Sequence, residues 1–228
     1  MPPIKFFYMP ESPPCRAVEM VANIVGVKLD KQYVNLFKKD HLKDDYVKLN
    51  PLHKVPFIID EDLHLNESRA IMTYLATRYG ADNHPYLYPK DPKERAQIDA
   101  LLYFDMGTLF QSAATLFRPM LFGKPDKLDE GHEQAFKDAL HYLDHKLGEN
   151  GAKRFISGNH YTVADVSIAA TLTFPVACGY DLHKYKQIVA YIERLKSAIP
   201  NYSEINGEPT ENMRKFIQSK REEHQQQQ

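Results

Sequence analysis

The segment IKFFYMPESPPCRAVEMVANIVG, residues 4–26, decides the fold of the first part of the chain. Residues 4–8 are mostly β-favouring aliphatic and aromatic side chains, and Pro10 ends this run. After the two prolines at 13–14, apolar side chains recur at helical spacing until Gly26, which favours the end of a helix. The segment therefore predicts a strand, a loop and a helix in that order.

The alternation of strand and helix continues beyond this segment. Residues 31–36 favour a second strand, which we expect to lie parallel to the first because a helix crosses between them. Residues 38–48 suit a short, partly exposed helix, residues 55–65 favour a hairpin, and residues 67–79 return to helical spacing. The order βαβαββα predicts a thioredoxin-like α/β domain over residues 1–80, with helices on both faces of a mixed sheet.

The rest of the chain has no strand alternation. Residues 81–92 are rich in Gly, Pro, Asn and Asp and predict a linker. Residues 93–217 predict an all-α second domain, because they contain long segments of helical spacing at 95–117, 133–147, 163–174 and 188–197. Residues 218–228 end in a run of glutamines, and we expect them to form a disordered tail.

Charge and composition exclude several classes of protein. The chain has 29 Lys and Arg against 30 Asp and Glu, so its formal net charge of -1 gives no field that would gather nucleic acid. No apolar run approaches the roughly 20 residues that span a bilayer, and no signal-peptide pattern is present. We therefore expect a cytoplasmic protein without a membrane partner. Cys15 and Cys178 are too few for a disulfide framework or a zinc site, and we expect two free thiols.

The loop between the predicted first strand and first helix carries the chemistry. A thioredoxin-like fold can hold a Cys-x-x-Cys pair here, but Ser12 stands in the first position and Cys15 in the second. A hydroxyl cannot form a disulfide, yet it can donate a hydrogen bond to a sulfur atom that a ligand brings in. This hydrogen bond and the positive end of the helix would lower the pKa of the ligand thiol. Two alternatives stay open: Ser12 only caps the helix, or Cys15, which we expect to pack inward, serves a thiol reductase.

A series of motifs extends over nearly the whole chain. It comprises Tyr8-x-Pro10-x-Ser12-x-Pro14-Cys15-Arg16, His41, Asn50-Pro51-x-His53-x-Val55-Pro56, Glu67-Ser68-Arg69-Ala70-Ile71, Tyr88-Pro89, Tyr103-Phe104-Asp105-Met106-Gly107 and Thr162-x-x-Asp165. Together these motifs resemble those of the cytosolic glutathione transferases of the arthropod delta and epsilon classes. The resemblance implies glutathione as cosubstrate and no metal or prosthetic cofactor.

The resemblance places the glutathione site in the first domain. It implies that Ser12 is the catalytic residue and that a cis bond between Val55 and Pro56 presents the backbone of Val55 to the cysteinyl part of glutathione. It further implies His41 and His53 for the glycyl carboxylate, and Glu67, Ser68 and Arg69 for the γ-glutamyl end. Leu52 departs from the family, which usually has a polar amide there. Without the resemblance, Glu67, Ser68 and Arg69 are also compatible with an ordinary capped surface helix, and His41 and His53 with two ordinary loop histidines.

The electrophile is expected to approach from the helical domain. On the predicted helix over residues 95–117, one face carries Tyr103, Met106, Phe110, Ala114 and Phe117, and the resemblance places this face above Ser12. Each of these side chains is also compatible with core packing. Phe122 and Tyr202 are further candidates for closing the pocket. The family counterpart of Asp105 lies near a subunit interface, and the resemblance implies a homodimer.

These features predict an enzyme that conjugates the glutathione thiolate to hydrophobic electrophiles in detoxification. Reduction of organic hydroperoxides is an expected side activity of the same thiolate. An alternative is a non-catalytic carrier of hydrophobic ligands on the same fold. We interpret Thr162 and Asp165 as a capping box, a device for folding and not for chemistry.

Overall fold

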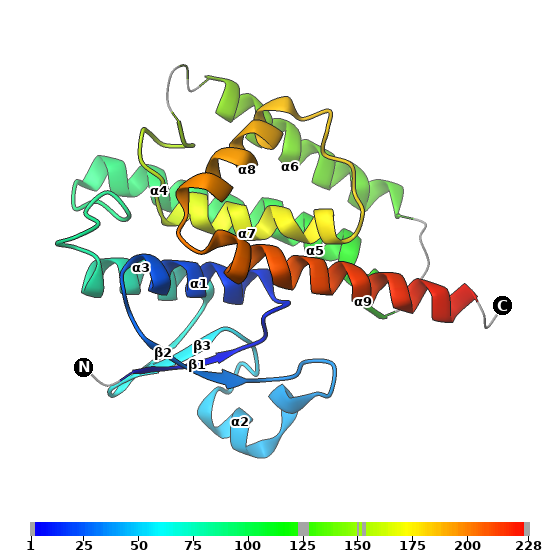
Figure 1. Ribbon diagram of the computed structural model, residues 1–228, viewed down its shortest axis with the longest axis horizontal. Coiled ribbons are helices and arrows are strands. Elements are labelled where there is room, and N and C mark those ends of the chain that lie inside the picture. Colours follow the sequence, from blue (N-terminus) through cyan, green and yellow to red (C-terminus); the bar gives the residue numbers. More distant parts are fainter. Residues whose placement is uncertain (1–2, 123–127, 150, 152–153, 226–228) are drawn as a thin grey trace.

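The computed structural model describes residues 3–122, 128–149, 151 and 154–225. Its first part contains a four-stranded mixed sheet with helices on both sides (Figure 1). The elements are β1 (Ile4–Tyr8), α1 (Pro13–Ile24), β2 (Leu29–Tyr33), the short 3₁₀ helix η1 (Asp40–Leu42), α2 (Asp44–Leu49), β3 (Phe57–Asp60), β4 (Leu63–Asn66) and α3 (Ser68–Tyr79). The strand order is β2-β1-β3-β4, with β1 parallel to β2 and the other pairs antiparallel. This arrangement confirms the predicted thioredoxin-like fold.

Two local predictions in this part need correction. The second strand ends at Tyr33 and not at residue 36, because β1 ends at Tyr8 and the last bond of this pair runs from the Val34 N–H to the Tyr8 carbonyl at 2.8 Å. The segment expected to be one helix over residues 38–48 is divided into η1 and α2. The division falls at Lys43, whose φ of -70° and ψ of 142° are those of extended backbone.

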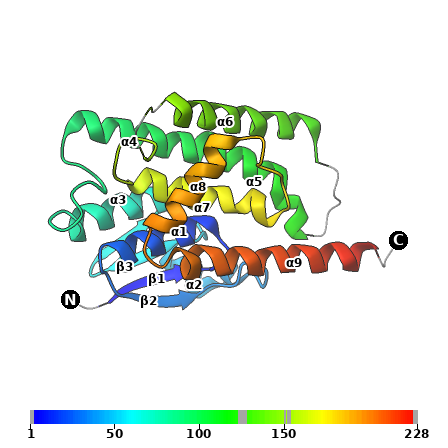
Figure 2. The same ribbon diagram turned by 45° about the horizontal axis from the view of Figure 1, so that its top comes forward.

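The helices form two unequal layers around the sheet. Helices α1 and α3 lie on the face that meets the rest of the molecule, whereas α2 lies on the opposite side (Figures 1 and 2). Helix α1 packs against both α3 and α7. Its Val18, Met20 and Val21 side chains are each 0% exposed. The buried face of α1 therefore belongs to both parts of the molecule.

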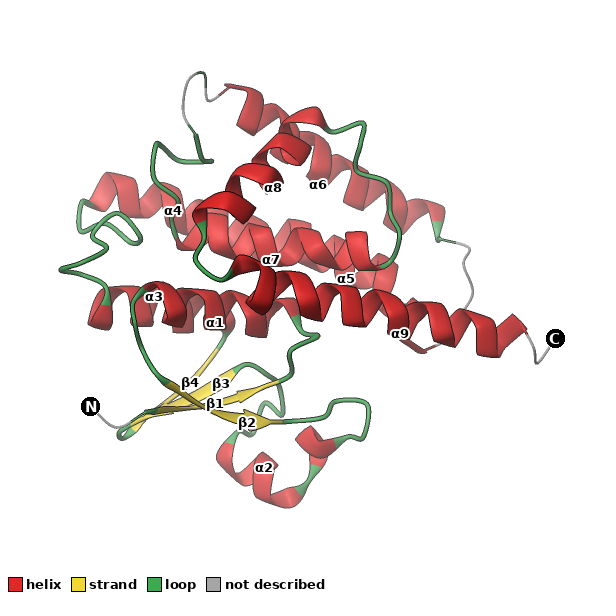
Figure 3. Ribbon diagram, viewed as in Figure 1, coloured by secondary structure: helices red, strands yellow, loops and turns green. Residues whose placement is uncertain are grey.

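The second part of the chain is helical in its described residues (Figure 3). Its elements are α4 (Pro92–Phe104), the π-helical segment η2 (Asp105–Phe110), α5 (Gln111–Phe117), the 3₁₀ segment η3 (Arg118–Phe122), α6 (Glu130–Glu149), α7 (Val163–Ala177), α8 (Lys186–Ala198), the π-helical segment η4 (Ser203–Gly207) and α9 (Glu208–Gln225). Helix α7 lies at the centre and contacts α1, α3, α4, α5, α8 and α9. Its buried residues lie all round the helix, as expected of a strongly apolar helix.

The predicted disordered tail is wrong for residues 218–225, because α9 continues to Gln225. Along α9, Met213 and Ile217 are buried, so one face of this polar helix is covered. One turn further, Arg221 Nη2 donates a hydrogen bond to the Cys178 carbonyl at 3.2 Å. The end of the helix is thus tied to the end of α7. Residues 226–228 lie outside the described residues.

A buried arginine connects the two parts of the molecule. Arg16 of α1 is 1% exposed. Its Nε donates to Asn206 Oδ1 of η4 at 2.8 Å, its Nη2 donates to Thr173 Oγ1 of α7 at 2.6 Å, and its Nη1 donates to the Pro10 carbonyl at 2.9 Å. Burial lowers the pKa of Arg16 to about 10. Three neutral acceptors therefore hold this guanidinium between the sheet domain and the helices.

The predicted capping box at the start of α7 is confirmed. Asp165 Oδ2 accepts the Thr162 N–H at 2.8 Å, and Asp165 Oδ1 accepts the Ile156 N–H at 3.0 Å and the Tyr191 hydroxyl at 2.6 Å. Asp165 is 0% exposed. It therefore joins the preceding loop and α8 to the helix that it caps.

Candidate active site

Ser12 is at the N-cap position of α1, but its side chain makes no capping hydrogen bond. Its carbonyl accepts the backbone N–H groups of Cys15 at 3.0 Å and Arg16 at 3.1 Å. The interpretation of Ser12 as only a cap is therefore wrong. Ser12 lines a cavity, where its hydroxyl can donate to a ligand.

Cys15 packs inward, as expected, and is 0% exposed. Burial raises the pKa of its thiol to about 11, although hydrogen bonding from Ser12 and the backbone of Met9 acts in the opposite direction. A buried, protonated thiol is a poor nucleophile. This environment disfavours the thiol reductase alternative.

The loop before β3 holds the backbone of Val55 in place. The bond between Val55 and Pro56 is cis, as the resemblance implied. The Lys54 carbonyl accepts hydrogen bonds from Asn50 Nδ2 at 2.8 Å and from the Tyr46 hydroxyl at 2.6 Å. Since Asn50 is 0% exposed, the loop is anchored to the interior immediately before the Val55 backbone reaches the cavity.

The start of α3 is built around a buried ion pair. Arg69 Nη2 lies 2.5 Å from Asp105 Oδ2, and Asp105 is 0% exposed. Arg69 Nη1 also donates to Ser68 Oγ at 2.9 Å, and Ser167 Oγ of α7 donates to the same oxygen of Asp105 at 2.5 Å. The Arg69 guanidinium lies over the ring of Phe110, 5.3 Å from its centroid. Asp105 thus fixes an arginine of its own chain, a contact that the sequence did not predict.

The two predicted histidines lie together. The ring centroids of His41 and His53 are 6.5 Å apart. His41 Nδ1 is buried and has no hydrogen-bond partner among the described residues. Burial, and then the neighbouring His53, lower the pKa of His41 and so favour the neutral ring. No cluster of three or more His, Cys, Asp or Glu side chains suited to a metal ion occurs in the described part of the chain.

All of the predicted glutathione-binding residues line one cavity of about 700 Å³ with Ser12. These are His41, His53, Val55, Pro56, Glu67, Ser68 and Arg69. Met106 and Phe110 from η2 line its other side. Side chains from the sheet domain and from the helical domain therefore line the same cavity as Ser12.

Two smaller cavities adjoin this site. A cavity of about 210 Å³ is also lined by Ser12 and has mainly apolar walls, formed by Leu36, Phe37, Phe110, Leu121, Phe122, Phe174 and Met213. Another of about 430 Å³ is lined by the predicted Ala114 together with Gln111, Arg118 and Phe122. The candidate Phe122 thus reaches both. The apolar pair Leu36 and Phe37 in a Lys- and Asp-rich stretch is the sequence signal that could have revealed this wall.

Three predicted pocket residues lie elsewhere. Tyr103 is 70% exposed and lines none of these cavities. Phe117 is 1% exposed, and its ring packs against the core side chains of Phe136 at 5.3 Å and Phe174 at 6.1 Å. Tyr202, at 5% exposure, is also a core residue.

The π-helical segment η2 explains two of these errors. A π turn takes about one residue more than an α turn. The face of the helix that meets the cavity therefore shifts along the sequence where η2 interrupts it. Gly107 and Phe110 lie on the predicted face, but further along Arg118 lines the cavities in place of Phe117. The prediction of the pocket face assumed a regular α-helix over residues 95–117, so it could not include this shift.

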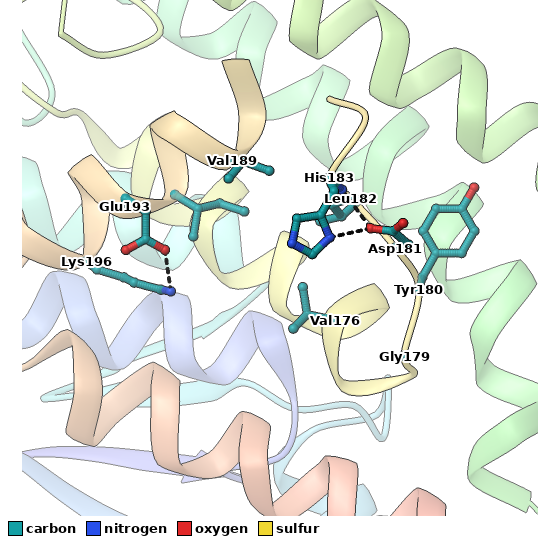
Figure 4. Close-up of a pocket in the computed structure, with 10 residues that line it drawn as sticks. Val176, Gly179, Tyr180, Asp181, Leu182, His183, Val189, Glu193 and Lys196 are labelled. Atoms are coloured by element: carbon teal, nitrogen blue, oxygen red, sulfur yellow. Dashed lines mark hydrogen bonds and ion pairs between the residues drawn. The ribbon is translucent and has the colours of Figure 1, made fainter. Parts of the chain in front are cut away.

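A further cavity of about 410 Å³ lies between the end of α7, the loop that follows it and α8 (Figure 4). Its polar side chains form two pairs: Lys196 Nζ lies 2.7 Å from Glu193 Oε1, and His183 Nδ1 lies 2.6 Å from Asp181 Oδ1. It shares no residue with the cavity around Ser12.

Comparison with known proteins agrees with this geometry. Residues 6–84 match the model of the glutathione S-transferase N-terminal domain. A delta-class glutathione transferase of Nilaparvata lugens is 42% identical, with a TM-score of 0.88 over 96% of this chain and 100% of that chain. An epsilon-class glutathione S-transferase of the housefly, Musca domestica, is 30% identical, with a TM-score of 0.85 over 95% and 98%. A glutathione transferase homologue of Drosophila mojavensis with bound glutathione is also 30% identical, with a TM-score of 0.87 over 96% and 98%.

The chain therefore belongs to the glutathione transferase family, and it is an enzyme whose relatives are insect proteins of the delta and epsilon classes. Within the described ranges, no helix combines the length and apolar character needed to cross a bilayer.

Proposed function

We propose that this enzyme transfers the glutathione thiolate to hydrophobic electrophiles and that Ser12 is its catalytic residue. The observation that carries the proposal is the single cavity that joins the Ser12 hydroxyl, the residues expected to bind glutathione and the apolar side chains of η2. Glutathione is the cosubstrate, and the proposal includes no metal or prosthetic group.

Each part of glutathione has a matching group in the cavity. The γ-glutamyl carboxylate lies at the start of α3, where unpaired N–H groups and the Ser68 hydroxyl are donors, and Glu67 accepts the ammonium group. The cysteinyl part pairs with the backbone of Val55. The glycyl carboxylate lies between His41 and His53. Leu52 contributes no side-chain hydrogen bond, and its side chain is 48% exposed.

The Ser12 hydroxyl carries most of the stabilisation of the thiolate. A helix N-terminus normally offers several backbone N–H donors to an anion. In α1, Pro13 and Pro14 have no N–H group, and the N–H groups of Cys15 and Arg16 already bond to the Ser12 carbonyl. The hydroxyl is therefore the nearest donor left for the sulfur.

The reaction requires no covalent bond to the enzyme. Glutathione loses its thiol proton to solvent, the sulfur forms a bond to an electrophilic carbon, and the leaving group departs with its electron pair. In a hydroperoxide side reaction, two glutathione molecules reduce one peroxide to an alcohol and water and become a disulfide. The apolar walls beside Ser12 suit flat or hydrophobic substrates in both cases.

Homodimerisation, which the resemblance implies, and a cytoplasmic location, which the sequence pattern predicts, complete the proposal. Light scattering of the purified chain tests the first part. We expect about twice the monomer mass of 26.4 kDa. Fractionation of the cells that express the protein tests the second.

The direct test measures conjugation of 1-chloro-2,4-dinitrobenzene by the wild type, Ser12→Ala and Cys15→Ser. We expect Ser12→Ala to lower kcat/KM by about 10- to 100-fold, the equivalent of one hydrogen bond to a charged group, with glutathione affinity kept. Cys15→Ser should remain active. Absence of turnover in the wild type, with hydrophobic ligands still bound, would instead support a carrier.

A further inference from the structure

Arg118 and Ser12 face the same space. Both line the cavity of about 700 Å³ and the adjoining cavity of about 210 Å³. Arg118 also lines the third cavity of about 430 Å³. An exposed cation therefore lines all three cavities, and it shares two of them with the hydroxyl that we propose to stabilise the thiolate.

The charge of Arg118 is not neutralised within the described part of the chain. There it makes no hydrogen bond, ion pair or ring contact. The other arginines nearby are already held: Arg69 pairs with Asp105, and Arg16 donates to three acceptors. Arg118 is thus a guanidinium available to a ligand, beside otherwise mainly apolar walls.

The apolar walls of the smaller cavity and the Arg118 guanidinium together indicate the chemistry of the ligand. Apolar side chains such as Phe110, Phe122 and Met213 suit an aromatic or aliphatic body. A guanidinium prefers a carboxylate or another group whose oxygens carry negative charge. The carboxylate of Glu11 lines the same smaller cavity and repels such a group. A substrate would therefore place its negative end at Arg118 and its reacting carbon at Ser12.

We propose that Arg118 makes the electrophile site selective for apolar electrophiles that bear a carboxylate away from the reacting carbon. This inference rests on the proposed function and adds the substrate class. With a chloronitroarene, the thiolate sulfur bonds to the ring carbon and negative charge spreads onto the ring substituents. Chloride then leaves with the electron pair of the broken bond. Arg118 stabilises the substituent charge before and during this step.

Arg118 could instead have a purely structural role. It is the C-cap residue of α5, where a cation interacts favourably with the helix dipole. Such a role would affect every substrate equally. A charge-selective effect therefore separates recognition of the substrate from stabilisation of the helix.

The test compares two glutathione conjugates of the same shape: the 2-nitro-4-carboxyphenyl and the neutral 2-nitro-4-carbamoylphenyl derivatives. Calorimetry measures their Kd for the wild type, Arg118→Met, Arg118→Lys and the control Arg214→Met. Arg214 is an exposed arginine of α9 outside the cavities. We expect Arg118→Met to weaken the carboxylate conjugate about tenfold more than the amide. Arg118→Lys should lie between, and the control should change neither.

Equal weakening of both conjugates by Arg118→Met, weakening of neither, or no binding of either by the wild type overturns the inference. Turnover of 4-chloro-3-nitrobenzoate and its amide is measured in parallel. Conjugate binding that depends on Arg118 without turnover of either chloride supports the inference and contradicts the proposed function. Turnover without an effect of Arg118 on charge selectivity leaves the function and removes the inference.

Discussion

The two halves of the site are held in different ways. On the glutathione side, Arg69 is paired with the buried Asp105, and the Val55 loop is anchored by the buried Asn50. On the electrophile side, Phe37 and Phe122 are 39% and 66% exposed and touch each other edge-on. Buried polar networks fix one geometry, whereas exposed aromatic side chains adapt to different partners. One half thus suits a single cosubstrate and the other suits a range of substrates.

The largest effect should come from breaking the buried ion pair on the glutathione side. We expect Asp105→Ala to lower the free energy of unfolding by about 3–5 kcal/mol, because Arg69 and the Ser167 hydroxyl lose a buried acceptor. Urea unfolding measures this change. Glu211→Ala, which breaks the exposed pair with Arg214, is the control and should cost about 1 kcal/mol or less. Equal losses in the two variants would mean that the glutathione side is no more rigid than the surface.

The histidine pair should make glutathione binding depend on pH. The pKa of His41 is lowered in the free enzyme, and a bound carboxylate favours the protonated ring and raises that pKa. Binding then takes up a proton, so affinity rises as the pH falls through the pKa of the bound state. S-methylglutathione, which has no titrating thiol, is the ligand to use in calorimetry. In His41→Gln we expect a weaker rise, and an unchanged pH profile would remove His41 from the site.

A smaller effect is expected on the electrophile side. Because Phe122 is exposed, Phe122→Ala should change the free energy of unfolding by less than about 0.5 kcal/mol. It should raise KM for a bulky aromatic electrophile about threefold to tenfold, since one wall of the pocket is lost. The KM for glutathione should stay the same. Steady-state kinetics with each substrate varied in turn measures both KM values. A change in both would contradict the independence of the glutathione and electrophile sides of the site.

The smallest effect should follow from changing Tyr103. This residue lies before the π-helical segment and is turned away from the cavities, so Tyr103→Ala should leave kcat/KM for the same electrophile within about twofold. A loss as large as that in Phe122→Ala would place Tyr103 in the pocket after all.

Much of the fold and the polar half of the site could be predicted from the sequence. Strands and helices follow the periodicity of their apolar residues, and the polar residues arrive as local motifs whose spacing the fold preserves. His41, Val55 and Glu67 consequently lie around one cavity with Ser12. Their roles in binding remain predictions until a complex with glutathione is measured.

The apolar half could be predicted only in part. Met106 and Phe110 line the cavity of Ser12 as expected, and Ala114 lines an adjoining one, but the shift at η2 replaces Phe117 by Arg118. Other walls come from segments far apart in the chain, such as Phe37 and Phe216, whose ring centroids are 4.8 Å apart. No local pattern in a single sequence reports such contacts.

The end of the chain shows a different limit. Polar composition suggested disorder for residues 218–228, yet the buried face of α9 begins earlier, at Met213 and Ile217. The apolar spacing of that face is present in the sequence, and the contact of Arg221 with the Cys178 carbonyl extends it. Composition alone therefore underestimated the reach of the helix.

The most direct test of this account titrates the thiol of bound glutathione by its ultraviolet thiolate absorbance in the wild type and in Ser12→Ala. A free thiol of this kind ionises near pH 8.5. We predict a pKa at least about one unit lower in the wild-type complex, and a return toward the free value in Ser12→Ala. A bound thiol that ionises in the wild type as it does in buffer would contradict the central role of Ser12.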